Sequence, residues 1–282
     1  MTVLIKWKNH HIEDVEVDLL LNALKARYGY DFTGYARASL KRRLLGLSHY
    51  FDVAHLSQLI PLVLYDESVA QKVINHISVP TSEFFRDPAV WRQLRHTVLP
   101  QLASFPLINI WQAGCGFGQE AYSLVILLYE IGLLKRSRIF CSDINSAFLD
   151  EAHAGCWSVR NQQHWQENYL QTEGNNNFAR FFTQSTHNFC IRPEFKESIE
   201  FIEHNLVSDE VFKEMQLVLC RNVLLYFGNE LQERVVHLFT RSLERGGYLL
   251  LGRGENIVDL SEKHPQLELL NSSLQFYRKQ IS

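Results

Sequence analysis

A glycine-rich turn near the middle of the chain limits its fold more than any other feature. The turn, Ala113–Glu120 (AGCGFGQE), stands between an apolar run, Leu107–Gln112, and a stretch that is apolar nearly all round, Gln119–Leu133. A strand that turns on glycines into a helix is typical of open α/β sheets, whose ligands bind at the carboxyl ends of the strands. Glycines there tolerate positive φ and let the backbone approach a ligand closely. We therefore expect a binding site at this turn.

The rest of the C-terminal part agrees with an α/β fold. After Pro106, short apolar runs alternate with helical stretches, as in βαβ units around a mainly parallel sheet. The stretch Leu231–Arg245 is amphipathic, with Asn229 placed to cap it and Gly246 placed to end it. The predicted strands are Leu107–Gln112, Arg138–Ser142, Met215–Cys220 and Gly247–Gly252, with Glu200–His204 as a fifth.

The N-terminal part has a different rhythm. Residues 13–78 carry apolar side chains at spacings of three and four with no strand signal, and Thr33 is placed to cap a second helix. Pro80 then disfavours helical geometry in the residue before it. We expect a helical domain over residues 1–80, a linker over 81–105 and an α/β domain over 106–282. Within the last, the polar and irregular stretch 156–198 is expected to be an inserted subdomain.

The charge balance excludes some partners. The chain has 28 Lys and Arg against 31 Asp and Glu, without blocks of like charge, which argues against broad attraction to nucleic acid or anionic membranes. Its longest strongly apolar stretch, Leu124–Leu134, is 11 residues long, and a bilayer span needs about 20. The N-terminus also lacks the apolar core of a secretory signal. We expect a cytoplasmic protein with no direct membrane insertion.

The five cysteines do not form a recognisable metal or disulfide pattern. They are widely spaced and include no CxxC pair, so neither a disulfide framework nor a zinc site is predicted, and we expect no metal. Two of them, Cys115 and Cys220, flank the expected pocket, and we interpret them as small apolar fillers.

The residues around the glycine turn favour one class of cofactor. Asp143 ends the second predicted strand 25 residues after Gly118, where its carboxylate could accept both hydroxyls of a ribose. The spacing is GxGxG, and Glu120 at the helix start would repel the pyrophosphate of a dinucleotide, which disfavours an NAD-dependent oxidoreductase. S-adenosylmethionine has no phosphate and carries an amino group that Glu120 could pair with. The alternative is a purely structural turn, with Asp143 as an ordinary helix cap.

At this point the chain resembles one family over nearly its whole length, the CheR-type protein-glutamate O-methyltransferases that modify chemoreceptors. Motifs FFRD, GQExYS and CRNVLxYF in this order are specific to it. The matching segments are YGYDFTGY (Tyr28–Tyr35), LKRRL (Leu40–Leu44), SEFFRD (Ser82–Asp87), WQAGCGFGQEAYS (Trp111–Ser123), SDIN (Ser142–Asn145), HNL (His204–Leu206), CRNVLLYF (Cys220–Phe227) and GGYLLLGRGEN (Gly246–Asn256).

The resemblance implies a helical N-terminal domain followed by a Rossmann-like S-adenosylmethionine-dependent methyltransferase domain with a small inserted antiparallel β-subdomain. It also implies that Glu120 holds the amino group of the cofactor and Asp143 its ribose. Ser82 stands where the family usually has Thr, and Ala121 where it usually has Pro, and neither change removes a needed group. The remaining cofactor residues that the resemblance implies are Asn205 and Leu206 at the adenine, with Ser82, Arg86, Arg221 and Asn222 completing the pocket.

The implied reaction needs no general base. A glutamate side chain has an ordinary pKa of about 4.3, so it is already an anion at neutral pH, and catalysis depends on proximity and alignment. The resemblance places Arg86 and Tyr226 nearest the transferred methyl group. Arg86 could anchor the incoming carboxylate and Tyr226 could orient it. The product would be a glutamate methyl ester with S-adenosyl-L-homocysteine.

The resemblance also implies a protein partner, the cytoplasmic helical bundle of a methyl-accepting chemotaxis protein. A basic cluster in the helical part, Arg37, Lys41, Arg42 and Arg43, is expected to help dock this acidic bundle, and the alternative is a solvated helix face. Some relatives grip a receptor tail peptide through a glycine-containing loop of the inserted subdomain. No glycine occurs over residues 175–227, so we expect no such tether.

Other functions stay open at this point. One is a regulatory module that binds S-adenosylmethionine or its demethylated product without turnover, which the presence of both Arg86 and Tyr226 disfavours. Another is methylation of RNA or of a small molecule, which the charge balance and the extent of the resemblance disfavour.

Overall fold

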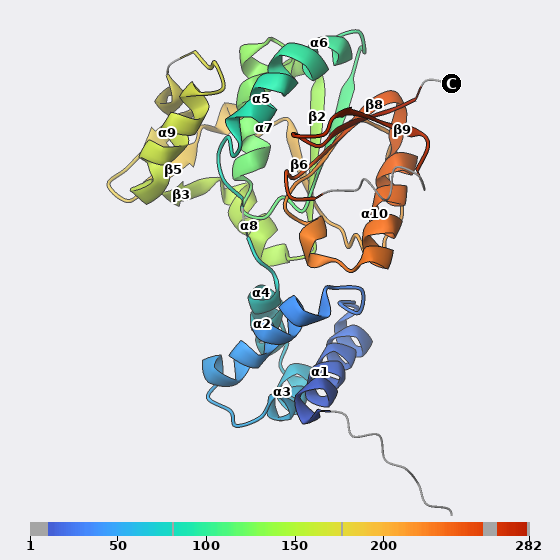
Figure 1. The fold of residues 1–282 in the computed structure, drawn as a ribbon. Helices are drawn as coiled ribbons and strands as arrows, with labels where there is room; N and C mark the ends of the chain where they lie inside the picture. The colour runs from blue at the N-terminus through green and yellow to red at the C-terminus, as the bar shows by residue number, and fades with distance from the viewer. Residues whose placement is uncertain (1–10, 81, 176, 256–263, 281–282) are drawn as a thin grey trace, which may run out of the picture. The chain divides into compact units, whose positions relative to one another are not determined.

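The structure is a computed structural model that describes residues 11–80, 82–175, 177–255 and 264–280. Two compact units are distinguished (Figure 1). A helical unit comprises Met1–Val79 with Tyr226–Gly228, and a Rossmann-like unit comprises Pro80–Leu225 with Asn229–Ser282. Among the described residues, none of the helices has both the length and the apolar character that crossing a membrane would take.

The helical unit packs its helices around an aliphatic core. Leu20, Leu24, Leu44 and Val63 are fully buried there, which accounts for the spacing of three and four in this part of the sequence. The helices are α1 (Ile12–Tyr28), α2 (Arg37–Tyr50), α3 (Leu59–Tyr65) and α4 (Glu67–Ile77), with a 3₁₀ turn at Leu56–Gln58. Asp66 caps α4, because its side chain accepts a hydrogen bond from the Ser68 N–H at 2.9 Å.

The expected cap at Thr33 is wrong. Its hydroxyl and its N–H both donate to Asp31 Oδ1, at 2.6 and 2.9 Å, and α2 begins only at Arg37. Residues 33 and 34 instead form a turn, and Tyr35 after it pairs with Phe227 through an isolated antiparallel bridge. This pairing explains why the short segment around Phe227, distant in sequence, counts with the helical unit.

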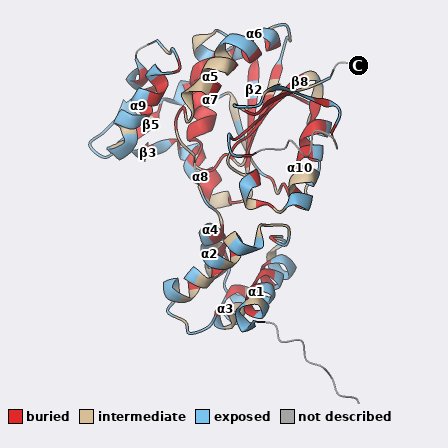
Figure 2. Cartoon of the chain, in the orientation of Figure 1, coloured by how far each residue is buried: buried red, intermediate tan, exposed pale blue. Residues whose placement is uncertain are grey.

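The Rossmann-like unit is built on a seven-stranded sheet in the order β6-β2-β1-β7-β8-β10-β9. The first five of these strands run parallel to one another. Strand β10 pairs antiparallel with both of its neighbours, β8 and β9. The strands are β1 (Ile108–Ala113), β2 (Ser137–Asp143), β6 (Ile199–Glu203), β7 (Met215–Cys220), β8 (Leu243–Leu251), β9 (Leu267–Asn271) and β10 (Phe276–Lys279). Strands β1, β2, β7 and β8 are mostly buried, and Figure 2 shows this for β2 and β8.

This strand order places the site. The chain leaves β1 toward β2 and β6 on one side and returns to β7 on the other, so the carboxyl ends of β1 and β7 lie at a topological switch point. Helix α7 (Gln119–Glu130) follows β1 and α8 (Ser146–Ala154) follows β2, while α10 (Asn229–Ser242) leads into β8. The expected stop of α10 at Gly246 is wrong, since the chain enters β8 at Leu243 and Gly246 lies inside that strand with φ +80°.

The segment 81–105, expected to be a linker, is an integral part of the Rossmann-like unit. It forms α5 (Pro88–Gln93), a π-helical turn (Leu94–Val98) and α6 (Leu99–Leu102). Its apolar residues, among them Val90, Leu94 and Leu99, are fully buried in the same core as β1 and α7. The two units therefore divide at Val79 and Pro80, with no connecting segment between them.

The inserted subdomain carries a three-stranded antiparallel sheet in the order β3-β5-β4 and one longer helix, α9 (Gln162–Leu170). The strands are β3 (Cys156–Ser158), β4 (Phe182–Gln184) and β5 (Asn188–Ile191). The expectation that no cysteines pair is wrong, because Cys156 and Cys190 are cross-strand neighbours joined by a disulfide. The remaining three cysteines are buried and free, as expected of Cys115 and Cys220.

Candidate functional site

Two adjacent phenylalanines anchor the FFRD segment in the Rossmann-like unit. Phe85 packs against Trp91 and Tyr169, with ring centroids 5.3 and 5.2 Å apart. Phe84 enters the aromatic core of the inserted subdomain, where its ring centroid lies 4.9–5.6 Å from those of Trp157, Trp165, Phe178 and Phe182. Because Phe84 and Phe85 pack against different groups of aromatic residues, the backbone between them is fixed. Phe85 adopts a left-handed conformation there, with φ +52°.

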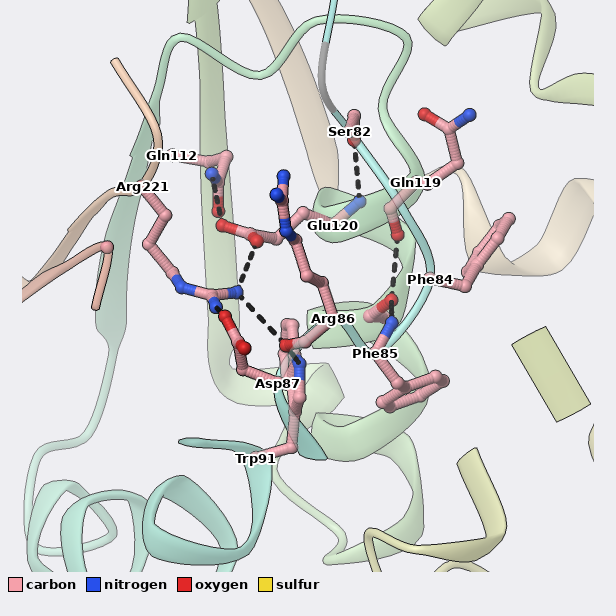
Figure 3. Close-up of polar contacts among 12 residues, drawn as sticks. Ser82, Phe84, Phe85, Arg86, Asp87, Trp91, Gln112, Gln119, Glu120 and Arg221 are labelled. Carbon is pink, nitrogen blue, oxygen red and sulfur yellow. Dashed lines mark hydrogen bonds and ion pairs between the residues drawn. The ribbon is translucent and has the colours of Figure 1, made fainter. Parts of the chain in front are cut away.

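The backbone on both sides of Arg86 is held by hydrogen bonds (Figure 3). The Phe85 N–H donates to Ser123 Oγ at 3.0 Å, and the Arg86 carbonyl accepts from Trp91 Nε1 at 2.9 Å and from Arg221 Nη1 at 3.3 Å. A left-handed non-glycine residue costs about 1–3 kcal/mol and persists only where its surroundings determine it. The turn is thus built to present the Arg86 side chain.

A buried guanidinium joins this turn to α7. The Arg221 side chain is fully buried, and its Nη1 lies 2.5 Å from Glu120 Oε2 while its Nη2 lies 2.6 Å from Asp87 Oδ2. Glu120 Oε1 accepts a further hydrogen bond from Gln112 Nε2 at 2.9 Å. In the cluster formed by Arg221, Glu120 and Asp87, Asp87 Oδ1 also lies 3.8 Å from Nη1 of the exposed Arg253. Glu120 is therefore the carboxylate of this cluster that has only one cationic partner among the described residues and could pair with a cationic group of a ligand.

The glycine turn is required by close packing as well as by conformation. Gly114 and Gly118 have φ +69° and +83°. A Cβ on Gly114 would lie 2.4 Å from Val223 Cγ2, and one on Gly118 would lie 2.9 Å from the Ala152 Cβ. Both contacts are shorter than real Cβ atoms tolerate, so any side chain at these positions would displace the loop after β7 or helix α8.

Asp143 lies beside this turn at the end of β2. Its Oδ2 accepts from the Gly116 N–H at 2.9 Å and its Oδ1 from the Asn145 N–H at 3.0 Å, and the Ile144 N–H also donates to this carboxylate. Two carboxylate oxygens have about four lone-pair sites, so acceptor capacity remains for a ligand hydroxyl. Burial raises the pKa of Asp143 above its ordinary value, and these backbone donors oppose the rise. The helix cap of α8 is Asn145, whose side chain accepts from the Ala147 N–H, so Asp143 is not needed for capping.

The segment after β6 approaches Asp143 through its backbone. The His204 N–H donates to the Asp143 carbonyl at 3.1 Å. The next residue, Asn205, forms a local turn in which its Oδ1 accepts from the Val207 N–H at 2.9 Å, and Leu206 is 7% exposed. The structure therefore brings Asn205 and Leu206 to the same end of the sheet as Asp143.

Two further predicted residues shape neighbouring loops. Ser82 Oγ accepts from the Glu120 N–H at 3.1 Å, so this hydroxyl takes up one of the free donors at the start of α7. Asn222 has φ +61° in the loop after β7. Glu255 holds that loop, because its side chain accepts backbone hydrogen bonds from Gly252, Asn222, Leu225 and Val223, although burial raises its pKa. Asn256, which follows in the GRGEN motif, lies outside the described residues.

The site offers acceptors to a ligand that carries an ammonium group and hydroxyls. Gln112 Oε1 is buried without a hydrogen-bond partner in the described part of the chain, and it belongs to the amide that also donates to Glu120. An ammonium group placed there would satisfy it. Asp143 offers acceptors for ribose hydroxyls. The glycines of the turn have no side chains that would block a ligand from the backbone. Across the described ranges, no group of three or more His, Cys, Asp or Glu residues could hold a metal ion.

The remaining predicted residues lie in the helical unit, where each of three cations already has a partner. Arg37 pairs with Asp18 and donates to the Asp14 carbonyl, while Lys41 Nζ lies 2.8 Å from Asp14 Oδ1 and 3.1 Å from Glu13 Oε2. These contacts raise the pKa of Lys41 through its hydrogen bond to Asp14. Acids of α1 thus lie against Arg37 and Lys41, and the docking role of the basic cluster stays a prediction.

The other two residues of the basic cluster differ from each other. Arg43 is half-buried, donates to the Ile77 carbonyl and to Ser39 Oγ, and lies over the ring of Tyr226 with its Cζ 4.7 Å from the centroid. Burial lowers the pKa of Arg43. Arg42 is exposed. Tyr226 is thus described within the helical unit, and its orienting role remains a prediction.

Four residues of the site had no role assigned from sequence. Asp87, Gln112, Trp91 and Glu255 hold other residues of the site in place, as described above. Asp87, Gln112 and Glu255 stand inside motifs that carry the resemblance, and this position is the signal that could have drawn attention to them.

Comparisons with known proteins agree with this geometry. The family described as "CheR methyltransferase, SAM binding domain" matches residues 80–272, and "CheR methyltransferase, all-alpha domain" matches residues 16–78. A Pseudomonas putida protein described as "Putative methyltransferase Cher3" is 40% identical over 266 residues, covering 94% of this chain and 97% of that protein. The "Chemotaxis protein methyltransferase" of Listeria monocytogenes is 29% identical over 252 residues, covering 88% and 93%.

Solved structures resemble the chain more remotely. The N-methyltransferase NodS of Bradyrhizobium japonicum, solved with S-adenosyl-L-homocysteine, is 13% identical with a TM-score of 0.38, covering 69% of this chain and 90% of NodS. The family matches cover both units, and they agree with the strand order and the glycine turn of the structure. The chain belongs to the CheR methyltransferase family.

Proposed function

We propose that this protein transfers the methyl group of S-adenosylmethionine to glutamate side chains of methyl-accepting chemotaxis proteins in the cytoplasm. The observation that carries the proposal is the strained FFRD turn, which presents Arg86 beside the cluster formed by Arg221, Glu120 and Asp87. An arginine presented beside a cation-binding cluster suits a reaction between an anionic acceptor and a cationic methyl donor. Relatives with the name "Chemotaxis protein methyltransferase" support the choice of acceptor.

The residues of the Rossmann-like unit divide the work between holding the donor and holding the acceptor. Glu120 and Gln112 would bind the donor's ammonium group, and Asp143 its ribose, with Asn205 and Leu206 at the adenine. Arg221 keeps Glu120 in place, and Ser82 and Asn222 shape the adjacent loops.

Arg86 would hold the acceptor carboxylate by charge-assisted hydrogen bonds. A glutamate is ionised at neutral pH, so its oxygen needs no base to become a nucleophile. S-adenosylmethionine, when bound, supplies an electrophilic methyl group on a sulfonium sulfur and leaves as S-adenosyl-L-homocysteine. The chain itself contributes by aligning the acceptor carboxylate with the methyl group. Holding two reactants in the right geometry can accelerate a reaction greatly.

The proposal is tested by incubating the protein with S-adenosylmethionine labelled in its methyl group and with membranes of its own organism. We expect base-labile label on a band of receptor size, since a glutamate methyl ester is cleaved by base. At saturating S-adenosylmethionine, the Arg86→Ala variant should lose at least tenfold in labelling rate.

Two results would contradict the proposal. Tight binding of S-adenosylmethionine with no labelled receptor band would favour a regulatory module without turnover. Base-stable label would indicate a different acceptor atom. The matched control is Arg92→Ala, which removes an arginine of α5 whose guanidinium donates to the Gln171 carbonyl, away from the FFRD turn.

A further inference from the structure

A polar groove borders the site on the side of the inserted subdomain. Its cavity has a volume of about 450 Å³, within the range of ligand pockets. Ser82, Glu83 and Arg86 line one wall, Gln119 lies at the start of α7, and Asn161 and His164 come from the inserted subdomain. The groove thus runs from Arg86 to a part of the fold that the cofactor residues do not include.

Gln119 provides a hydrogen-bond acceptor that the protein itself does not use. The residue is 6% exposed, and within the described ranges its Oε1 is buried without a partner. In Figure 3 its side chain lies on the Ser82 side and points away from Arg221 and Glu120. Gln119 lines the groove, so its unpartnered oxygen lies in the groove wall.

The other polar groups of the groove leave this acceptor to a ligand. His164 Nε2 pairs with Glu83 Oε1, which also accepts from Asn168 Nδ2 at 3.0 Å. The Gln119 backbone carbonyl accepts from Ser123 Oγ at 2.8 Å, so helix α7 does not depend on the Gln119 side chain. A ligand of this groove therefore meets a cationic group at Arg86 and an acceptor at Gln119.

We propose that the groove is a subsite for the acceptor protein beside the methylated glutamate, and that Gln119 Oε1 accepts a hydrogen bond from an amide or hydroxyl side chain there. This inference rests on the proposed function. A buried acceptor left unpaired penalises a substrate without the donor, so Gln119 selects among glutamates by what stands next to them.

The test compares two substrates with three forms of the enzyme. The substrates are the cytoplasmic fragment of a methyl-accepting receptor from the same organism, and the same fragment with every amide and hydroxyl side chain within one helical turn of the methylated glutamate changed to alanine. The enzymes are the wild type, Gln119→Met, which keeps length without an acceptor, and Gln163→Met, the same change on the exposed side of α9. KM for each fragment is measured at saturating S-adenosylmethionine.

We expect Gln119→Met to raise KM for the native fragment about 5- to 50-fold, while the dissociation constant of S-adenosylmethionine, measured by calorimetry, changes less than about twofold. For the wild type and for Gln163→Met, KM for the alanine fragment should exceed KM for the native fragment by a similar factor. For Gln119→Met, KM should be the same for the two fragments. An unchanged KM, or a weaker affinity for S-adenosylmethionine alone, overturns the inference. If the wild type methylates neither fragment, the proposed function fails as well, and the wild-type assay alone reveals that.

Discussion

Asp143 is a carboxylate whose charge is opposed by its surroundings. Burial raises its pKa, while backbone N–H groups of Asn145, Gly116 and Ile144 lower it, and burial is the larger effect. Only the ionised form offers acceptors to two ribose hydroxyls. The pKa of this carboxyl is higher in the folded chain than in the unfolded chain. Protonation on acidification therefore stabilises the folded chain through this group.

We therefore expect the affinity for S-adenosylmethionine to fall on acidification, beginning at a less acidic pH than the ordinary aspartate value of 3.8 would give. Calorimetric titrations from pH 8 downward measure this, and circular dichroism shows that the fold persists over the same range. Asp143→Asn should bind at least tenfold more weakly at pH 8 and lose most of the pH dependence. Equal pH dependence in the variant would assign the titration to another group.

At the scale of elements, the FFRD turn is the part whose geometry depends most on distant residues. Asp87 adopts φ +55°, and its Oδ2 lies 2.6 Å from Nη2 of the fully buried Arg221. Asp87→Asn should remove the charge while keeping the shape, leaving Arg221 with Glu120 alone. We expect a loss of about 1–3 kcal/mol in the free energy of unfolding, less than for a fully buried pair because Asp87 is 27% exposed.

The same substitution should lower kcat/KM about 10- to 100-fold, because a shifted turn misaligns Arg86. Urea denaturation and initial rates well below the unfolding midpoint separate the two effects. Asp150→Asn, a like change on the exposed face of α8, should alter neither. A variant that is less stable yet fully active would show that Arg86 is aimed without Asp87.

The elements differ in how far the sequence predicts them. The five parallel strands are predicted to within four residues at each end, because apolar runs between turn residues mark buried strands. The strand β9, in which Leu269 and Leu270 are exposed, lacks such a run and was not predicted. The cap expected at Thr33 is wrong because α2 begins only at Arg37, after Tyr35 has paired with Phe227. Phe227 is distant in sequence, so local sequence does not show this pairing.

The site follows the same division between near and distant neighbours. Glu120 and Asp143 are predictable, since each stands at a fixed distance from the glycine turn. The contact of Asp87 with Arg221 spans 134 residues, and the separation of Gln119 from the Arg221 cluster depends on the direction of one side chain. Only the folded chain supplies such information.

At the scale of the whole molecule, the chain divides into two units, and the ion pairs between α1 and α2 belong to the helical unit. In the helical unit, Arg37 and Lys41 oppose Glu13, Asp14 and Asp18 of α1. Changing both cations to glutamate would place five acidic groups together. Such a change tests the stability of the helical unit before it tests any partner.

Arg42 is the better probe of receptor docking, because it is exposed and has no ion pair among the described residues. We expect Arg42→Glu to lower the rate of receptor methylation about 2- to 10-fold at physiological salt, with less effect at high salt, where surface charges are screened. Arg37→Glu with Lys41→Glu should instead lower the midpoint of thermal unfolding by several degrees. The affinity for S-adenosylmethionine, which depends on residues of the Rossmann-like unit, should stay within about twofold in Arg42→Glu. Methylation by Arg42→Glu at the wild-type rate, at low and high salt alike, would remove the basic cluster from the docking surface.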